Sequence, residues 1–340
     1  MALATRSWCS LSLPRQRASW GVLNAAFACA ALYTSCASQP SPPKTATSQR
    51  LAAPTPHCAE TGNALQVLGS GGPIADDARA SSAYLVWLDG KARVLVDAGG
   101  GLLQRFGQSG AKLEDLDVIA LSHLHADHSA GLPALLKSGY FSDRERPLLL
   151  VGPTAAGRFP SVTDFRSSLI GPEQGAFRYL ASYEDGSHRF FELPVREVTA
   201  NVGQHTVAFD NERLRVEAIG VKHGSVPALG FVLTLKRYGT RIGFAGDQAA
   251  GNVGFEQLAR GVDLLVLHHP IPESARGLSE LHARPSELGA MAKRTGARKV
   301  VLSHHMKRSL EVLEQGVKFV QAESGERPDV AEDLSCYPLN

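Results

Sequence analysis

Near the middle of the chain lies the stretch Ser122-His123-Leu124-His125-Ala126-Asp127-His128. It follows an apolar run at 117–121 and precedes a segment with helical character, which predicts a loop at a strand end. Imidazole nitrogens and carboxylate oxygens are zinc ligands, and three protein ligands with an open fourth position make a catalytic zinc site. A cluster of surface or capping histidines is the alternative, but burying so many uncompensated polar groups would be costly. The stretch therefore predicts a metal site.

Short apolar runs on both sides of this loop indicate an α/β fold. Runs that are apolar on both faces are typical of buried strands, and longer segments between them predict helices. Because strands and helices interleave, we expect packed layers of sheet and helix. The segment 153–213 is less regular and is expected to be an insertion or a cover over the site. The expected strands are 64–69, 82–88, 92–97, 117–121, 147–151, 214–221, 228–236, 241–245, 263–268 and 299–303, and the expected helices are 129–138, 255–260, 285–295 and 308–320.

Further candidate ligands stand at the ends of other expected strands. His223 follows the strand at 214–221, Asp247 follows 241–245, and the pairs His268-His269 and His304-His305 end the last two strands. A single histidine is more often structural than a ligand. Repeated placement at strand ends favours one shared site, since such sheets bind ligands along one edge.

The composition is that of a globular protein. Hydrophobic residues make up 44% and charged residues 20% of the 340 residues, and the net charge is +2. So small a net charge predicts no nucleic-acid partner, because nucleic-acid-binding domains usually carry a strong positive charge. A small-molecule substrate is expected instead, and a homodimer is compatible with the sequence.

The first 57 residues have the pattern of a targeting segment. Arg15 and Arg17 precede an apolar run at 20–33, which is short for a membrane span and is followed by small residues. Cys36 stands where a bacterial lipoprotein carries its lipid; cleavage near Ala37 without lipid and an organelle transit peptide are alternatives. The prediction is a signal peptide at 1–36, a flexible linker at 37–57 and a metallo-hydrolase domain at 58–340. The protein is expected to be exported, either periplasmic or anchored to the membrane through Cys36.

Two cysteines lie outside this leader, one at each end of the expected domain. Cys58 and Cys336 could form a disulfide in an oxidising compartment, or both could be free thiols. The sequence gives no distance between them, so both alternatives stay open.

Six motifs together resemble those of one known family. They are Leu68-Gly69-Ser70-Gly71-Gly72-Pro73, Val96-Asp97-Ala98-Gly99, the 122–128 stretch, Val221-Lys222-His223-Gly224, Phe244-Ala245-Gly246-Asp247 and Leu302-Ser303-His304. The set is similar to the metallo-β-lactamase fold superfamily, and within it to the ribonuclease Z and arylsulfatase-like branch, over about 64–320. The resemblance implies a four-layer αββα sandwich. It also implies a hydrolase that uses two zinc ions per chain and a hydroxide bridging them.

The resemblance also implies a role for each site residue. His123, His125 and His223 would hold one zinc ion, while Asp127, His128 and His304 would hold the other, with His305 as the substitute for His304. Asp247 would bridge the two ions. Asp127 and His282 are the expected catalytic residues, His282 as a proton donor to the leaving group. Asp97 is interpreted either as a residue that orients a ligand imidazole or as a turn residue at the strand end.

Departures from the family guide the choice of substrate. Ribonuclease Z has a long arm that grips tRNA between the positions matching His223 and Asp247, but here only residues 224–246 separate them. The sequence therefore predicts hydrolysis of a small phosphodiester or sulfate ester and not tRNA processing. Hydrolysis of a lactone or β-lactam is a second hypothesis, weakened because no cysteine lies in the motifs. A metal-binding protein without catalysis is a third, and the complete ligand set argues against it.

Overall fold

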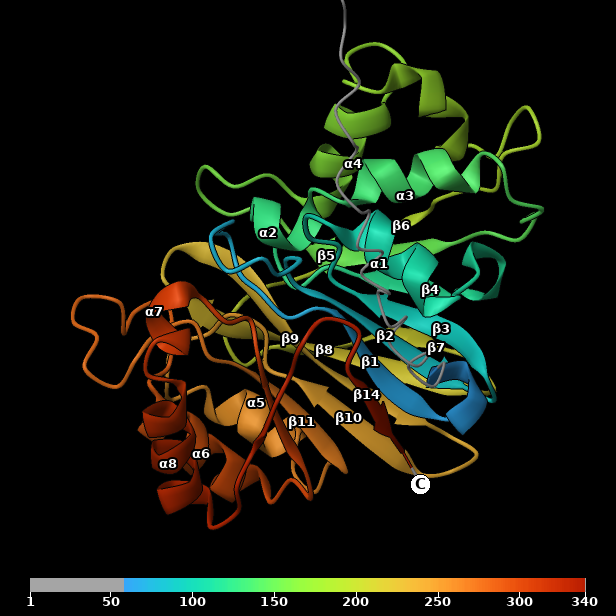
Figure 1. Ribbon diagram of the computed structural model, residues 1–340. Helices are drawn as coiled ribbons and strands as arrows, with labels where there is room; N and C mark the ends of the chain where they lie inside the picture. Colours follow the sequence, from blue (N-terminus) through green and yellow to red (C-terminus); the bar gives the residue numbers. More distant parts are fainter. Residues whose placement is uncertain (1–57, 340) are drawn as a thin grey trace, which may run out of the picture. The chain divides into compact units, whose positions relative to one another are not determined.

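The computed structural model describes residues 58–339. The predicted signal peptide, the linker and the lipid anchor at Cys36 lie outside the described residues. Within 58–339, two seven-stranded sheets lie between outer layers of helices (Figure 1). The first sheet has the order β14 (Cys336–Pro338), β1 (Ala64–Gly69), β2 (Ala83–Leu88), β3 (Lys91–Val96), β4 (Val118–Ala120), β5 (Leu149–Pro153) and β6 (Val195–Val198). The second has the order β13 (Asp329–Val330), β12 (Val300–Ser303), β11 (Leu264–His268), β10 (Thr240–Phe244), β9 (Val226–Leu235), β8 (Leu214–His223) and β7 (His205–Asp210).

The helices divide between the outer faces of the two sheets. In Figure 1 the labelled helices α1, α3 and α4 of the first group lie above the first sheet, and α5, α6 and α8 of the second group lie below the second sheet. The first group is α1 (Leu102–Ser109), α2 (Ala126–Ser129), α3 (Leu132–Gly139) and α4 (Val162–Ile170), with the 3-10 turns η1 (Cys58–Thr61), η2 (Leu113–Asp115) and η3 (Arg178–Tyr183). The second group is α5 (Val253–Leu258), α6 (Pro285–Thr295), α7 (Lys307–Leu310) and α8 (Leu313–Ser324).

Three hydrophobic clusters hold these layers together. One lies between the sheets and includes Val67 and Phe231. A second packs the outer face of the first sheet, with Leu68, against the helix residue Leu135. The third packs the second sheet against α6, with Met291 at its centre. Central strands such as β2 and β11 are buried on both faces and are therefore continuous apolar runs, whereas the edge strands β6 and β7 are partly exposed. The predicted four-layer αββα sandwich is confirmed by this arrangement.

Most differences from the expected elements have local causes. The helix expected at 308–320 is interrupted at residues 311–312, between α7 and α8. Helix α4 was not expected, although Ser161 and Asp164 form a capping box at its start and give it a sequence signal. Strands β6 and β7 lie in the irregular segment 153–213 and form the outer strands of the two sheets. That segment is therefore partly built into the sandwich and is not wholly an insertion.

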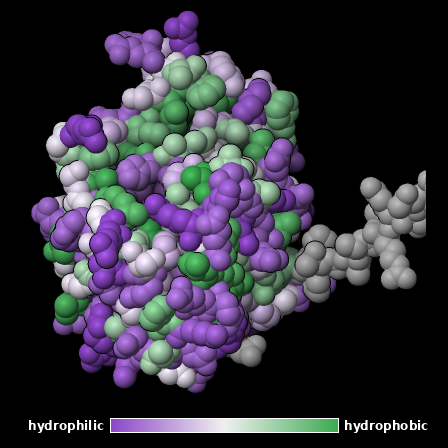
Figure 2. All heavy atoms as spheres, turned by 60° about the vertical axis from the view of Figure 1, so that its left-hand side comes forward, coloured by the Kyte–Doolittle hydropathy of each residue, from purple (hydrophilic) through white to green (hydrophobic). Residues whose placement is uncertain are grey.

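The surface of the described part is mixed in character. Figure 2 shows hydrophilic and hydrophobic side chains interspersed over one face of the molecule. Across residues 58–339, every helix is too short or too polar to cross a membrane.

Cys58 and Cys336 form a disulfide, which closes the question left open by the sequence. It links η1 to β14, and β14 in turn pairs with β1, so the two ends of the described chain are joined. A crosslink that closes so long a loop restricts the unfolded chain. Replacing both cysteines with serine should lower the free energy of unfolding by about 2–4 kcal/mol, measured by urea denaturation. Equal denaturation midpoints for the variant and the oxidised parent would contradict this expectation.

Candidate metal centre

The loop that follows β4 is fixed to the neighbouring strand by Asp97. This residue follows β3 and has a left-handed backbone, with φ 57°, which is uncommon for a residue other than glycine. Its carboxylate accepts hydrogen bonds from the Ser122 backbone N–H at 2.7 Å and from the Ser122 hydroxyl at 2.9 Å. Asp97 therefore holds the start of the loop in place, so the histidines that follow are positioned by β3 as well as β4.

The first ligand group consists of His123, His125 and His223. One ring nitrogen of each lies within 4.8 Å of the others, and His123 Nε2 is 2.9 Å from His125 Nδ1. The Nδ1 of His223 lies 2.8 Å from the Leu281 carbonyl oxygen and donates to it. With Nδ1 engaged in that bond, Nε2 of His223 is buried and has no hydrogen-bond partner. The three rings therefore present ligand atoms to one point.

The second group consists of Asp127, His128 and His304. His304 Nε2 is 3.1 Å from both Asp127 Oδ2 and His128 Nε2. His128 Nδ1 donates to Asp97 Oδ2 at 2.8 Å, which leaves Nε2 to face the other two residues. Asp97 thus makes the contact expected of a residue that orients a ligand imidazole.

Backbone geometry gives His304 its place in this group. Its φ is 54°, a strained value that is typical of functional sites. A side-chain carbon at Gly72 would come within 2.9 Å of the His304 ring, so the glycine turn at 69–72 leaves room for it. His305 lies away from the group, with Nε2 3.1 Å from the Leu302 carbonyl oxygen. His304 therefore occupies the position for which His305 was the substitute.

Asp247 lies between the two groups. Its Oδ2 is 3.9 Å from His123 Nε2, 3.6 Å from His128 Nε2 and 3.8 Å from His223 Nε2. Its Oδ1 is 3.4 Å from His304 Nε2. A single carboxylate thus reaches ligand atoms of both groups, as a bridging residue would. The structure brings all seven predicted ligands together from loops far apart in the sequence.

His268 is a member of the site that was not assigned a role from sequence. Its Nδ1 donates to Asp247 Oδ1 at 2.7 Å, and its Nε2 is 3.0 Å from the Tyr84 hydroxyl. In the sequence, the only signal for His268 was its position at the end of an apolar strand, β11. That position did not show whether His268 is a metal ligand or a residue that supports one. Because Oδ1 is held by His268, the other oxygen of Asp247 is turned towards the two groups.

Replacing His268 with alanine should weaken zinc binding by about 10–100-fold, because such supporting hydrogen bonds fix ligand orientation. An asparagine at this position can still donate a hydrogen bond to Asp247 and should retain most of the affinity. Competition with a chromogenic zinc chelator measures both variants. Equal zinc affinity of the alanine variant and the parent would show that the contact has no orienting role.

His282 lies at the rim of the cluster. Its Nδ1 is 4.0 Å from Asp247 Oδ2 and has no hydrogen-bond partner. Its ring centre is 5.2 Å from that of His223. His282 is therefore placed to reach a molecule bound beside the two groups. It also forms a further three-residue group with His223 and Asp247 that could hold a metal ion.

The charges in the cluster divide the histidines into two kinds. Burial lowers the pKa of His123 well below its usual value, and burial lowers that of His125 as well. Burial would also lower the pKa of His128, but the carboxylates of Asp97 and Asp247 outweigh it and raise that pKa well above its usual value. Without a metal ion, His123 and His125 are therefore neutral at pH 7, while His128 in the second group holds a proton.

This difference predicts how zinc uptake depends on pH. A raised pKa means that zinc must displace a proton from His128, so affinity at the second group should fall by up to about tenfold per unit as the pH is lowered from 8 to 6. His123 and His125 in the first group have lowered pKa values and so have no proton to displace over this range. Chelator competition with His304→Ala, which retains the first group, and with His123→Ala, which retains the second, separates the two. Equal pH dependence in both variants would contradict the assignment of the proton to His128.

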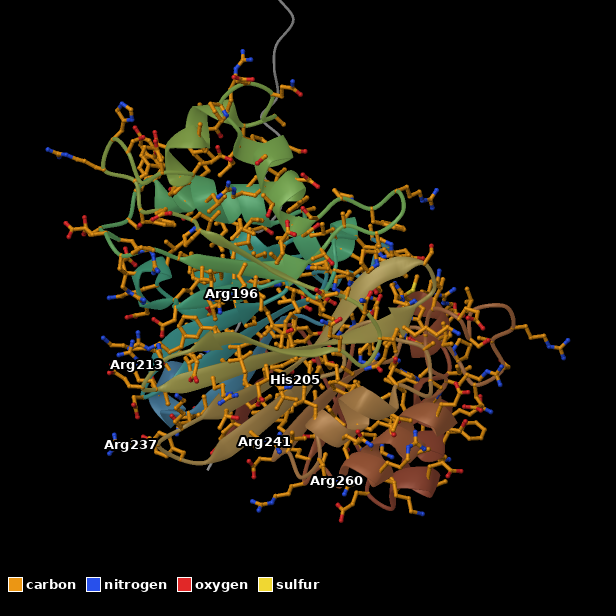
Figure 3. All side chains as sticks on the ribbon, turned by 180° about the vertical axis from the view of Figure 1, so that it is seen from behind. Arg196, His205, Arg213, Arg237, Arg241 and Arg260 are labelled. Atoms are coloured by element: carbon orange, nitrogen blue, oxygen red, sulfur yellow. A yellow bond between two sulfur atoms is a disulfide. The ribbon has the colours of Figure 1, made fainter. Side chains whose placement is uncertain are left out.

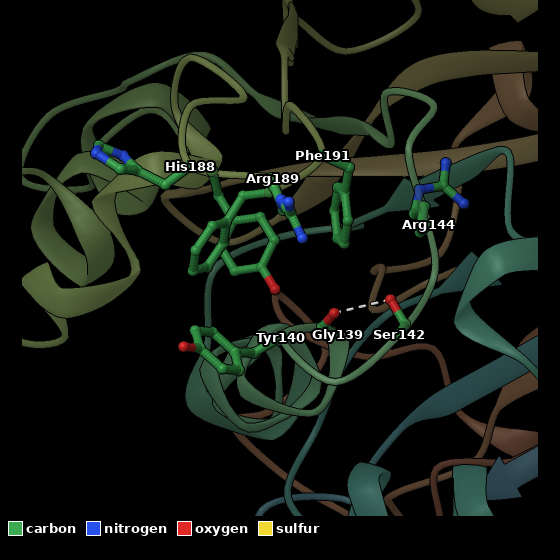
Figure 4. Close-up of a pocket in the computed structure, with 9 residues that line it drawn as sticks. Gly139, Tyr140, Ser142, Arg144, His188, Arg189 and Phe191 are labelled. Atoms are coloured by element: carbon green, nitrogen blue, oxygen red, sulfur yellow. Dashed lines mark hydrogen bonds between the residues drawn. The ribbon is translucent and has the colours of Figure 1, made fainter.

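The donor set fits a divalent metal ion. Buried imidazole nitrogens and carboxylate oxygens converge in two three-residue groups, and the unpartnered Nε2 of His223 is costly to bury unless something binds it. Nitrogen with some carboxylate is a ligand set suited to zinc. A separate hollow of about 210 Å³, lined by Tyr140, Arg144, Arg189 and Phe191 among others, contains none of these residues (Figure 4).

Comparison with known proteins agrees with this geometry. A family model described as "Beta-lactamase superfamily domain" matches residues 92–305. The ribonuclease Z of Mycobacterium bovis is 28% identical over 258 residues, which cover 71% of this chain and 85% of that protein. The ribonuclease Z of Metallosphaera sedula is 29% identical over 256 residues, 70% of this chain and 86% of that protein.

Solved structures share the fold. The short form of human tRNase Z has a TM-score of 0.63 and 22% identity, and the match covers 82% of this chain and 99% of that one. The metallo-beta-lactamase fold protein YhfI from Bacillus subtilis has a TM-score of 0.62 and 18% identity, with 81% and 98% covered. At these identities, the structures support the four-layer fold alone.

The relatives correct three predictions. The curated relatives are named for cutting RNA, so the predicted small-molecule substrate and the predicted absence of a nucleic-acid partner are wrong. Net charge was a poor guide to the substrate because it sums the charges of the whole chain and does not report the charge around one local site. The predicted export to the periplasm or to a membrane anchor is also contradicted, by the match to relatives named ribonuclease Z. A basic, apolar and small-residue pattern is too unspecific to prove a signal peptide.

The matched residues 92–305 contain all seven converging ligands, and the fold and the donor chemistry agree with the family model. The chain therefore belongs to the beta-lactamase superfamily, as a metal-dependent hydrolase with the metallo-β-lactamase fold.

Proposed function

We propose that this hydrolase holds two zinc ions and cleaves phosphodiester bonds of RNA. The proposal rests on one observation above all, the two ligand groups on either side of Asp247. His123, His125 and His223 would hold one ion, and Asp127, His128 and His304 the other. The type of bond is inferred from the relatives, which are named ribonuclease Z.

The ligands are held in place before any ion binds. When bound, zinc supplies a Lewis acid that activates water near neutral pH and offsets negative charge on the reacting group. The Leu281 carbonyl orients His223, Asp97 orients His128, and His268 orients Asp247. Such contacts set the tautomer and direction of each ligand. Asp127 faces His304 and can accept a hydrogen bond from the attacking water.

His282 is proposed to supply the proton that the leaving oxygen needs. Burial lowers the pKa of His282 to about 3, so its ring is neutral at pH 7 in the free site. An anionic phosphate bound beside the ring favours its charged form, because opposite charge raises the pKa of an imidazole. A proton held at Nδ1 could then pass to the leaving oxygen as the bond breaks.

Zinc titration into chelator-treated protein, followed by a substrate panel, tests this proposal. The panel holds a short RNA strand, bis(p-nitrophenyl) phosphate, p-nitrophenyl sulfate, a chromogenic cephalosporin and a lactone. We expect two equivalents of zinc and turnover of the phosphodiesters. Turnover of the sulfate, the cephalosporin or the lactone without any cleavage of a phosphodiester would overturn the proposal.

A further inference from the structure

The connection between β5 and α4 forms a tight turn at residues 156–159. Ala156 and Phe159 exchange two backbone hydrogen bonds, of 3.1 and 3.0 Å. Gly157 supplies the left-handed backbone that the turn needs, with φ 57°. Arg158 at the tip is exposed, and among residues 58–339 no carboxylate pairs with it. Its guanidinium carbon lies 5.4 Å from the centre of the Phe159 ring. The turn thus presents an aromatic ring and a free cation together.

This turn lies beside the metal centre. The ring centres of Phe159 and His125 are 6.3 Å apart. A hollow of about 200 Å³ separates the loop that leads into the turn from the β8–β9 hairpin, with Ala155 and Ala156 on one side and His223 and Pro227 on the other. His223, a candidate ligand of the first group, therefore forms part of the wall, and Ala156 links the hollow to the turn that carries Arg158 and Phe159.

The lining of the hollow suits a neutral planar group. Most of its side chains are small and apolar, and the exposed Val202 forms part of its edge. Its lysine, Lys222, is already 2.6 Å from a Glu280 carboxylate oxygen. Its volume is below the roughly 300 Å³ at the lower end of pockets for drug-sized ligands. One ring system would therefore fit between the hollow and the turn that carries Phe159 and Arg158.

We propose that the 156–159 turn and this hollow form a nucleotide subsite, an inference that rests on the proposed function. The base next to the cleaved phosphodiester would stack on Phe159, because a base can stack on an aromatic side chain whatever its sequence. Arg158 would contact the next phosphate, for which a guanidinium has matching donors. The subsite would therefore favour RNA over small phosphodiesters and would have little preference among the four bases.

A double-mutant cycle on the zinc-loaded protein tests the stacking contact. One change is the protein variant Phe159→Ala. The other is a short RNA substrate that lacks one base, tested separately for the base on each side of the cleaved bond. Each single change should raise KM for cleavage roughly tenfold. The two changes combined should give a KM less than about twofold higher than the KM of either single change, because both remove the same contact. Phe141→Ala is the matched control, since Phe141 is a 76% exposed phenylalanine that lies outside the 156–159 turn.

Arg158 has a matched control of its own. Arg237 lies 5.5 Å from the Tyr238 ring, in the turn between β9 and β10 and at the far end of β9 from the metal centre (Figure 3). Arg158→Ala should raise KM for RNA and make it less dependent on salt, whereas Arg237→Ala should not.

Two kinds of failure are distinguishable. If the protein cleaves neither RNA nor bis(p-nitrophenyl) phosphate, the proposed function fails, and the subsite fails with it. If RNA is cleaved but Phe159→Ala has the same KM as Phe141→Ala, the subsite alone is refuted. The same holds if the increases in KM caused by Phe159→Ala and by loss of the base multiply when the two changes are combined.

Discussion

Replacing His123 with alanine is expected to lower zinc content and to reduce hydrolysis by more than about a thousandfold, which corresponds to several kcal/mol of lost transition-state stabilisation. His123 is fully buried, and its Nε2 lies close to both His125 and Asp247. Alanine leaves two histidines in the first group, which is fewer than the three protein ligands of a catalytic zinc site. Zinc content by plasma mass spectrometry and steady-state cleavage of bis(p-nitrophenyl) phosphate measure the two effects.

His205 provides a matched control for this substitution. It is an exposed histidine on β7, 3.1 Å from Glu217, and it belongs to none of the candidate metal-binding groups (Figure 3). His205→Ala should keep its zinc and its rate. Undiminished turnover in His123→Ala would refute the ligand assignment.

Replacing His282 with alanine is expected to slow catalysis by about 10²–10⁴-fold while zinc content stays near that of the parent. The seven assigned ligands remain in this variant, and only the unpartnered ring at the rim is removed. The loss should fall mainly on kcat, since a proton donor acts in the transition state and adds little to substrate binding.

The leaving group gives a sharper test of His282. A substrate whose leaving group has a low pKa, such as bis(p-nitrophenyl) phosphate, needs little proton donation, so the variant should lose far less activity on it than on RNA. If zinc content falls in His282→Ala, then His282 is a ligand, as its grouping with His223 and Asp247 would allow.

Much of the fold could be predicted because its strands are buried on both faces. Strand β1 and helix α6 have the predicted bounds, and β11 differs by one residue, since apolar runs, Pro285 and Gly296 mark their ends. The candidate ligands could be found for a related reason. Parallel strands such as β10, β11 and β12 end at the same edge, so polar residues after them meet.

Other features depend on contacts that no local pattern encodes. The role of His268 follows from Tyr84, which lies on the other sheet and reaches it across the interface between the sheets. The 156–159 turn looks like an ordinary loop in sequence, and the role proposed for it depends on a fold that places Phe159 beside His125. The small-molecule substrate was mispredicted because the missing arm was given more weight than the motifs that this chain shares with ribonuclease Z.

The central claim is that two zinc ions lie on either side of Asp247. X-ray diffraction from zinc-loaded crystals, measured on both sides of the zinc absorption edge, tests it most directly. The account predicts two anomalous peaks, one contacted by His123, His125 and His223 and the other by Asp127, His128 and His304, with Asp247 touching both. A single peak, or a second peak away from Asp247, would contradict it.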